Sequence, residues 1–192
     1  MKYLRYVFYK VQELIDVLRG VDFATVYENI PKEIGTRYSA TTPRIYWKLY
    51  SYLKRQTRKD IKMLDVGCGK GRMLEFFSRC GIGTVDGIEY SEELVRIART
   101  NMDVLGLKCN IFHGNAAEWH GYDFYNYFYL FNPFGKVIME GFGKSLVTSC
   151  RMNPRKITII YFNPKEERTL IELGMKKEQD IVDQCSVFTY EI

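Results

Sequence analysis

The sequence is poor in the residues from which metal sites and disulfide frameworks are built. It has two histidines, His113 and His120, and its five cysteines are widely spaced, with no C-x-x-C pair. Zinc sites need clustered ligands of these types, and disulfide frameworks normally use an even number of cysteines. We therefore expect no metal site, and reduced thiols that pack as small apolar side chains.

Long apolar runs are also missing. No stretch approaches the ~20 uninterrupted apolar residues that a membrane-spanning helix requires. The chain begins with basic residues, but Lys10, Glu13 and Asp16 interrupt the apolar pattern that follows, and no small-residue cleavage site comes after them. These absences predict a cytoplasmic protein without a membrane partner.

Positive charge is present, but it is concentrated in the first third of the chain. The formal net charge is +5, and residues 1–60 hold twelve Lys or Arg against six Asp or Glu. Residues 34–59 contain seven basic side chains, no acidic one, and interleaved tyrosines and a tryptophan. These are Arg37, Arg44, Lys48, Lys54, Arg55, Arg58 and Lys59, with Tyr38, Tyr46, Trp47, Tyr50 and Tyr52. Such a mixture suits nucleic acid or an acidic protein, and the plain alternative is a cap helix with a solvated basic face.

Residues 1–57 are expected to form an N-terminal helical extension or cap. Apolar residues recur at helical spacing through 2–19, and Gly20 is a plausible stop. This stripe is most often core packing, with contact to a second copy of the chain as the alternative. A second helix should begin at Thr42-Pro43 and run through Leu53. Tyr38, Thr41 and Thr42 are placed to form a lid over a bound ligand.

From residue 58 to 192, strand and helix patterns alternate, which predicts an α/β domain. Strands are expected near 61–66, 84–89, 109–113, 124–131 and 156–162, with two more within 174–192. Helices are expected near 70–80, 91–105, 136–150 and 165–173. This alternation implies a parallel sheet covered by helices on both faces. The run 124–131 is aromatic at nearly every position, as expected of a central strand.

The most informative motif is a glycine-rich loop after the first of these strands. Asp65 ends an apolar run, and glycines follow at 67, 69 and 71 before a helix opens. Glycines permit a tight turn and close approach of a ligand to the backbone. The G-x-G-x-G spacing differs from the G-x-G-x-x-G of dinucleotide sites, and no G-K-[ST] pair follows, which excludes a P-loop. Asp65 is suited to a positively charged amino group.

A second acid stands at the corresponding place in the next strand. Glu89 ends the strand at 84–89, about twenty residues after the loop, where a carboxylate can accept both hydroxyls of a ribose. The third strand ends in His113-Gly114-Asn115-Ala116, where a polar side chain can meet an adenine edge. Asn115 as an ordinary turn residue is the alternative.

Together these motifs resemble the class I S-adenosylmethionine-dependent methyltransferases. The matching segments are D-V-G-C-G-K-G-R at 65–72, G-I-E-Y-S at 87–91 and G-N-A at 114–116, in the order and spacing of the family. The resemblance implies a Rossmann-like seven-stranded sheet of order 3-2-1-4-5-7-6 with the last strand antiparallel, and a cofactor-binding domain at 58–192. It also implies S-adenosyl-L-methionine as cofactor. The residues that would bind it are Asp65, Gly67, Cys68, Gly69, Gly71, Glu89, Tyr90, Asn115 and Ala116.

The fourth strand runs into Asn132-Pro133-Phe134, which is similar to the [N/D/S]-P-P-[Y/F/W] motif of amino-group methyltransferases but one proline shorter. The likeness implies that Asn132 orients an acceptor nitrogen, with Pro133 beside it and Phe134 as a pocket wall. The alternative is a strand-ending turn with a core aromatic.

The favoured function is therefore methyl transfer to a nitrogen of a protein or small molecule. An RNA or DNA acceptor, held by the basic-aromatic segment, is one alternative. A non-catalytic module that binds the cofactor or nucleic acid is the other.

Overall fold

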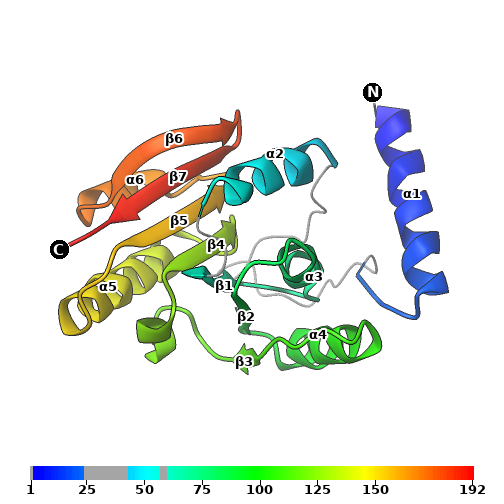
Figure 1. Cartoon of the computed structure of the whole chain (residues 1–192), viewed down its shortest axis with the longest axis horizontal. Helices are drawn as coiled ribbons and strands as arrows, with labels where there is room; N and C mark the ends of the chain where they lie inside the picture. The colour runs from blue at the N-terminus through cyan, green and yellow to red at the C-terminus, as the bar shows by residue number, and fades with distance from the viewer. Residues whose placement is uncertain (1, 24–42, 57–59) are drawn as a thin grey trace.

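A computed structural model describes residues 2–23, 43–56 and 60–192 (Figure 1). Its centre is one seven-stranded sheet of order β3-β2-β1-β4-β5-β7-β6. The strands are β1 (Lys62–Val66), β2 (Thr84–Glu89), β3 (Ile111–His113), β4 (Tyr127–Phe131), β5 (Ile157–Phe162), β6 (Lys176–Val182) and β7 (Cys185–Tyr190). Strand β7 is antiparallel to both of its neighbours, and the other pairings are parallel. The predicted fold class and strand order are confirmed.

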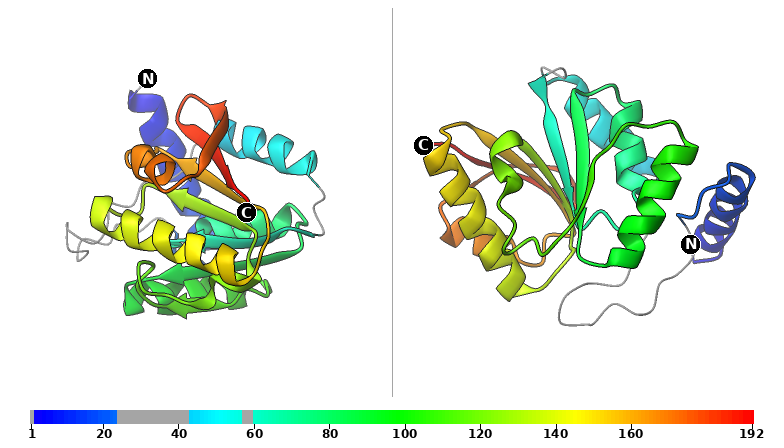
Figure 2. Two further views of the ribbon diagram at one scale, coloured as in Figure 1. Left: turned by 90° about the vertical axis from the view of Figure 1, so that its left-hand side faces the viewer. Right: turned by 90° about the horizontal axis from the view of Figure 1, so that it is seen from below.

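Helices cover both faces of this sheet (Figure 2). One face carries α2 (Pro43–Lys54), α3 (Arg72–Arg79) and α4 (Glu92–Val104), and the other carries α5 (Lys136–Met152) and α6 (Glu167–Glu172). The helix α1 (Lys2–Leu18) lies beyond α3 and α4, away from the sheet (Figure 1). Parallel strands joined through helices need this cover, because neither face of such a sheet can be left in water.

The strands feed two apolar cores, one on each side of the sheet. Along β4, Phe128 and Leu130 join the core beneath α5, whereas Tyr129 joins the core beneath α3. All three are at most 1% exposed. Burial of a large apolar side chain contributes about 1.5–3 kcal/mol, so the aromatic-rich central strand is a major source of stability. It is buried on both faces, as predicted.

That strand starts later than predicted. Residues Gly121–Phe124 form a short 3₁₀ helix, η2, and β4 begins only at Tyr127. The side chain of Arg155 donates to the backbone carbonyls of both Tyr122 and Tyr125 at 2.8 Å, and the Tyr122 carbonyl also accepts from the amide of Tyr125 at 3.0 Å. A side chain far along the sequence therefore satisfies backbone groups that a longer strand would have paired with its neighbours.

The helix predicted at 2–19 exists, but over residues 10–18, where the side chains are described, the core packing expected of its apolar stripe is wrong. Leu14 is 60% exposed and Leu18 is 78% exposed, while Asp16 on the same helix is 2% exposed. The helix thus turns a carboxylate toward the domain and apolar side chains toward solvent. Contact with a second copy of the chain through this helix stays a prediction.

Helix α2 behaves as an amphipathic cap over the sheet. Leu49 and Leu53 are fully buried, and Tyr46 packs against Phe76 of α3 with ring centroids 4.8 Å apart. Trp47 is 68% exposed. In the described part, the basic-aromatic segment therefore uses most of its rings for packing. The predicted lid residues, Tyr38, Thr41 and Thr42, lie outside the described residues. Over the ranges that the structure describes, no helix has the length and apolarity needed to cross a membrane.

Candidate active site at the carboxyl ends of the strands

The glycine loop lies at the carboxyl end of β1, where the carboxyl ends of β2, β4 and β5 also meet. In open parallel sheets, ligands bind in the crevice at this edge, where neighbouring connections run to opposite faces. Gly67, Gly69 and Gly71 have φ values of +77°, +54° and +87°. Side chains rarely adopt such values, so the alternation of glycines follows directly from the left-handed turns of the loop.

Backbone groups of the loop are tied to the end of β2. The amides of Gly67 and Cys68 donate to the carbonyl of Ile88 at 2.8 and 3.1 Å. Glu89 Oε2 accepts from the amide of Gly69 at 2.9 Å, and Glu89 Oε1 accepts from the amide of Ser91 at 3.0 Å. Each carboxylate oxygen has a further lone pair. Burial raises the pKa of Glu89, while these amides act in the opposite direction. The predicted glycine loop and the predicted acid, Glu89, are thus joined directly by hydrogen bonds.

Asp65 is the second acid of this unit. It is 3% exposed, and its carboxylate accepts no hydrogen bond from the part of the chain that the structure describes. Burial, and then the charge of Glu89, raise the pKa of Asp65 well above its ordinary value. A buried carboxylate in this state favours a cationic partner, because a nearby positive charge stabilises its ionised form.

Cys68 lies inside the loop but has no chemical activation. Burial, and then the charges of Asp65 and Glu89, raise the pKa of its thiol well above the ordinary value. A protonated, buried thiol is a poor nucleophile. Its role is steric: a Cβ on Gly87 of the neighbouring strand would lie 2.7 Å from Cys68 Sγ. The side chain of Cys68 therefore packs against Gly87, where no larger residue would fit.

The loop also touches the segment after β4. A Cβ added to Gly67 would lie 2.6 Å from Cβ of Pro133, closer than two such atoms can approach. The structure therefore brings the predicted cofactor loop and the predicted acceptor motif into direct contact, although they are more than sixty residues apart in the sequence. Because Gly67 itself is exposed, this junction faces solvent and is open to a ligand.

Asn132 holds a strained conformation at the junction. Its φ is +39° and it is 5% exposed. Its backbone amide donates to the backbone carbonyl of Phe162 at 3.1 Å. Asparagine tolerates the left-handed region better than most residues, but the conformation still has a cost, and such residues concentrate at functional sites. This geometry is compatible with the role predicted for Asn132.

Phe134 is placed differently from its predicted role. Its ring is 5% exposed and lies in the core beneath α5, with its centroid 6.1 Å from that of Phe142. The structure thus favours the alternative of a core aromatic over that of a pocket wall. In this sequence the aromatic residue stands one position earlier than in the motif of amino-group methyltransferases.

The predicted adenine side is built by the end of β3. Asn115 Oδ1 accepts from the amide of Ala117 at 3.0 Å, and Asn115 Nδ2 donates to Glu118 Oε1 at 3.1 Å. The side chain thus shapes the turn, which is the alternative reading of this residue, and Ala116 behind it is buried. Tyr90 is 47% exposed, and its carbonyl accepts from Nε2 of His113 at 2.9 Å. Their contacts to a cofactor stay predictions.

One residue at this edge was missed from the sequence. Strand β5 ends in Phe162-Asn163-Pro164, which repeats the tripeptide that ends β4. The rings of Phe131 and Phe162 pack edge to face, with centroids 4.6 Å apart, and Asn163 also has a positive φ, +51°. Its side-chain amide has no hydrogen-bond partner among the described residues. The repeated tripeptide was visible in the sequence and is the signal that would have identified Asn163.

Comparison with known proteins agrees with this geometry. Residues 63–137 match the family model of a methyltransferase domain. A curated relative, protein-L-isoaspartate O-methyltransferase of Caenorhabditis elegans, is 31% identical over 98 residues. That match covers 47% of this chain and 44% of the relative, so the chain aligns with less than half of the relative's length.

Solved structures share the fold at low identity. A 16S rRNA N2 methyltransferase of T. thermophilus, in complex with AdoMet and guanosine, superposes with a TM-score of 0.58 at 17% identity, over 82% of this chain and 45% of that one. A ribosomal protein L11 methylase from Lactobacillus delbrueckii subsp. bulgaricus superposes with a TM-score of 0.55 at 15% identity, over 88% and 82%. Residues 63–137 therefore match a methyltransferase domain, and the chain shares the fold of these methyltransferase structures.

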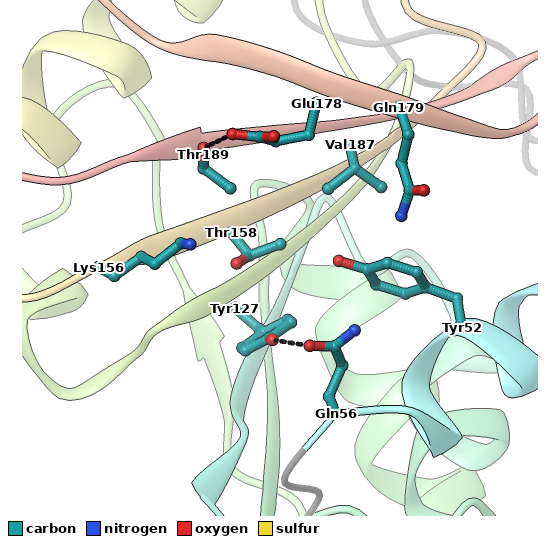
Figure 3. A pocket seen from close by; sticks show the side chains of 9 residues that line it. All are labelled: Tyr52, Gln56, Tyr127, Lys156, Thr158, Glu178, Gln179, Val187 and Thr189. Carbon is teal, nitrogen blue, oxygen red and sulfur yellow. Dashed lines mark hydrogen bonds between the residues drawn. The ribbon is translucent and has the colours of Figure 1, made fainter.

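The domain also has a cavity lined by residues of α2, β4, β5, β6 and β7 and of the segments beside them (Figure 3). This cavity of about 500 Å³ is lined by Tyr52, Gln56, Tyr127, Lys156, Thr158, Glu178, Gln179, Val187 and Thr189. Tyr127 is the first residue of β4 and Thr158 the second of β5, so the cavity lies at the amino ends of these strands. It is at the opposite edge of the sheet from Asp65 and Asn132 and is distinct from the candidate active site.

Proposed function

We propose that this protein transfers the methyl group of S-adenosylmethionine to a nitrogen of a protein or small-molecule acceptor. The observation that carries the proposal is the contact between Gly67 and Pro133, because it joins an acid-lined glycine loop to Asn132. A cofactor bound in the loop and an acceptor bound at Asn132 would therefore be neighbours.

The residues present fit this cofactor. Asp65, buried and without a hydrogen-bond partner in the described chain, would bind the amino group of the methionine part. Glu89 would accept hydrogen bonds from the ribose hydroxyls with the lone pairs that Gly69 and Ser91 leave open. Gly67 and Gly69 would let the ligand lie against the backbone. The amino group and the ribose hydroxyls of the cofactor thus each have a matching group.

Methyl transfer needs little acid–base catalysis. When bound, S-adenosylmethionine supplies a methyl group on a positively charged sulfur, and transfer to an amine breaks that carbon–sulfur bond and forms a carbon–nitrogen bond. The side-chain oxygen of Asn132 would accept an N–H of the neutral acceptor and so aim the nitrogen lone pair. Positioning and exclusion of water would account for most of the acceleration.

Asn163 would serve as a second orienting group. It directly follows the strand that pairs with the one before Asn132, it also has a positive φ, and its side-chain amide has no partner within the described ranges. Two amides side by side can donate to and accept from one planar polar group of an acceptor. This pairing supports a nitrogen acceptor that carries neighbouring hydrogen-bonding atoms.

Two measurements test the proposal. Calorimetry with S-adenosylmethionine should show binding to the wild type and a loss of affinity of at least tenfold in Glu89→Ala, since two ribose hydroxyls lose their acceptor. No binding by the wild type, or unchanged binding by Glu89→Ala, would falsify the cofactor assignment. Incubation with methyl-labelled cofactor and fractionated cell extract should then place label in the protein or small-molecule fraction. Label in RNA would favour the nucleic-acid alternative, for which exposed Trp47 on α2 is the supporting observation.

A further inference from the structure

Two basic residues of the glycine loop, Lys70 and Arg72, point toward the N-terminal segment. Lys70 Nζ lies 2.7 Å from Oδ2 of Asp22, and its side chain is 4% exposed. Both terminal nitrogens of Arg72 donate to the carboxylate of Asp16, in a bidentate pair. Both basic side chains therefore bind carboxylates at the end of α1 or in the residues that follow it.

The backbone of the loop is held by the same segment through Asn101 of α4. Asn101 Nδ2 donates to the carbonyl of Lys70 and to the carbonyl of Asp22, both at 2.9 Å, and its Oδ1 accepts from the amide of Asp22 at 2.8 Å. Asn101 is 2% exposed. Its side chain therefore joins the loop, the helix α4 and the N-terminal segment in one network.

Apolar contacts complete the attachment. Gly20, with φ of +71°, ends α1 and turns the chain back toward the domain. Val21 and Phe23 are then buried in the core that includes α3 and α4. The guanidinium carbon of Arg72 lies 4.5 Å from the centroid of the Phe23 ring, a cation–π contact. The segment is thus anchored on both sides of Arg72.

A third ion pair ties the same helix end to α3. Arg19 and Arg79 both donate to Oε1 of Glu75, the latter at 2.7 Å. By contrast, the apolar side chains of α1 within residues 10–18 are exposed, and Asp16 is the one buried residue of that range. The helix is therefore attached to the loop and to the start of α3 by charge, with little apolar support of its own.

We propose that residues 16–23 are a clamp that holds the glycine loop in its ligand-binding conformation, with Lys70 and Arg72 as positioning residues. The loop has three glycines in left-handed conformations and would otherwise have many alternatives to its bound shape. The inference rests on the proposed function for the identity of the ligand. It assigns to Lys70 and Arg72 a role away from the methyl donor and acceptor.

A clamp of this kind couples ligand affinity to docking of the N-terminal segment, and such coupling is reciprocal. Loosening the segment weakens cofactor binding, and cofactor binding protects the segment. Both directions can be measured separately.

The test compares two variants of α1 that make the same chemical change. Asp16→Asn breaks the pair with Arg72, whereas Glu13→Gln three residues earlier affects only the exposed pair with Lys10. Calorimetry with S-adenosylhomocysteine should show roughly tenfold weaker binding in Asp16→Asn and wild-type binding in Glu13→Gln. Limited trypsin digestion without ligand should cut after Lys70 or Arg72 roughly tenfold faster in Asp16→Asn only.

Circular dichroism melts will show whether Asp16→Asn folds. If it does not, Asp22→Asn replaces it, since the side chain of Asp22 is 43% exposed and forms an ion pair with Lys70. Equal digestion rates in wild type, Glu13→Gln and the clamp variant would overturn the clamp, whatever the ligand result. If digestion differs but the wild type binds no S-adenosylhomocysteine, the clamp stands and the proposed cofactor falls. Binding that is equal in all three proteins overturns the coupling.

Discussion

The two halves of the carboxyl edge of the sheet are built differently. At the ends of β1 and β2, the loop amides of Gly67, Cys68 and Gly69 all have protein partners, and two of its side chains pair with the N-terminal segment. At the ends of β4 and β5, Asn132 and Asn163 hold strained conformations, and the side-chain amide of Asn163 has no partner in the described chain. The first half, with its loop amides satisfied and the carboxylate of Asp65 buried, is suited to one constant ligand that carries a cation. The second half, with the side-chain amide of Asn163 available, is suited to select an acceptor.

The contact between the halves is the place where a substitution should have the largest effect. Gly67→Ala would put a Cβ 2.6 Å from that of Pro133 and force alanine into a left-handed conformation. The left-handed backbone alone costs about 1–2 kcal/mol, and the clash must displace the loop or the acceptor motif. We expect loss of measurable cofactor binding in calorimetry and a lower melting temperature.

Gly81→Ala is the matched control for that change. Gly81 has φ of +65°, and a Cβ there would meet nothing within 4 Å. It should lose the same 1–2 kcal/mol, roughly, but keep cofactor affinity. Equal affinity losses in the two variants would contradict a specific junction between the halves.

The acceptor half can be tested without disturbing the cofactor half. Asn132→Gly keeps the positive φ, which glycine adopts freely, but removes the side-chain amide. We expect turnover to fall roughly 100-fold, as when a positioned polar group is lost from an active site, with cofactor affinity and melting temperature close to wild type. Asn163→Gly should show a smaller loss of turnover and a raised acceptor KM. If turnover survives in both variants, the acceptor does not bind at these asparagines.

The cofactor half should show a conflict between stability and binding at Asp65. Its pKa is raised in the folded state, so the folded protein disfavours the charge that the unfolded chain carries above the ordinary pKa of 3.8. Asp65→Asn should therefore stabilise the ligand-free protein at pH 7, and this gain should vanish as the pH falls below 3.8. Its affinity for S-adenosylmethionine should fall roughly tenfold or more.

Thermal melts with and without the cofactor at pH 7 check both parts of this prediction. If Asp65→Asn is less stable than the wild type without ligand, or binds S-adenosylmethionine as tightly, then Asp65 does not bind the cationic group of the cofactor.

The smallest effect is expected at the outer edge of the cofactor half. Burial acts to raise the pKa of Glu75, but hydrogen bonds and charges from Arg19 and Arg79 outweigh it and lower the pKa. The stabilisation is present above the ordinary value of 4.5 and is lost as the pH falls through the lowered pKa. Glu75→Gln should cost about 1–2 kcal/mol at neutral pH and flatten this acid limb. The control is Glu172→Gln, in an exposed pair with Arg168. It should leave urea-unfolding curves unchanged both at neutral pH and on the acid limb.

The sequence predicted the domain well because its signals are local or carried by a family pattern. The alternation of strands and helices, the left-handed glycines and the acids at the ends of β1 and β2 all follow from short segments. The order of the strands came from the resemblance. The contact of Gly67 with Pro133 follows from that order, since β1 and β4 are neighbours.

What the sequence could not predict depends on which side of an element meets the rest of the chain. The periodicity of α1 is real, but no local rule indicates that Asp16 docks and Leu14 stays exposed, because the partner, Arg72, is 56 residues away. Phe134 was assigned by analogy with a motif that is one proline longer, and its ring packs in the core against Phe142. Asn163 was missed because only the pairing of β5 with β4 brings it next to Asn132.

The two asparagines at the acceptor half share one more property, because each is followed by proline. Spontaneous deamidation of asparagine proceeds through attack of the next residue's backbone nitrogen on the side-chain carbonyl, and a proline nitrogen has no hydrogen to lose. Asn132 and Asn163 are therefore protected from ageing into aspartate, whereas Asn115, followed by Ala116, is not. The side chains of these two asparagines therefore do not acquire a negative charge by this route as the protein ages.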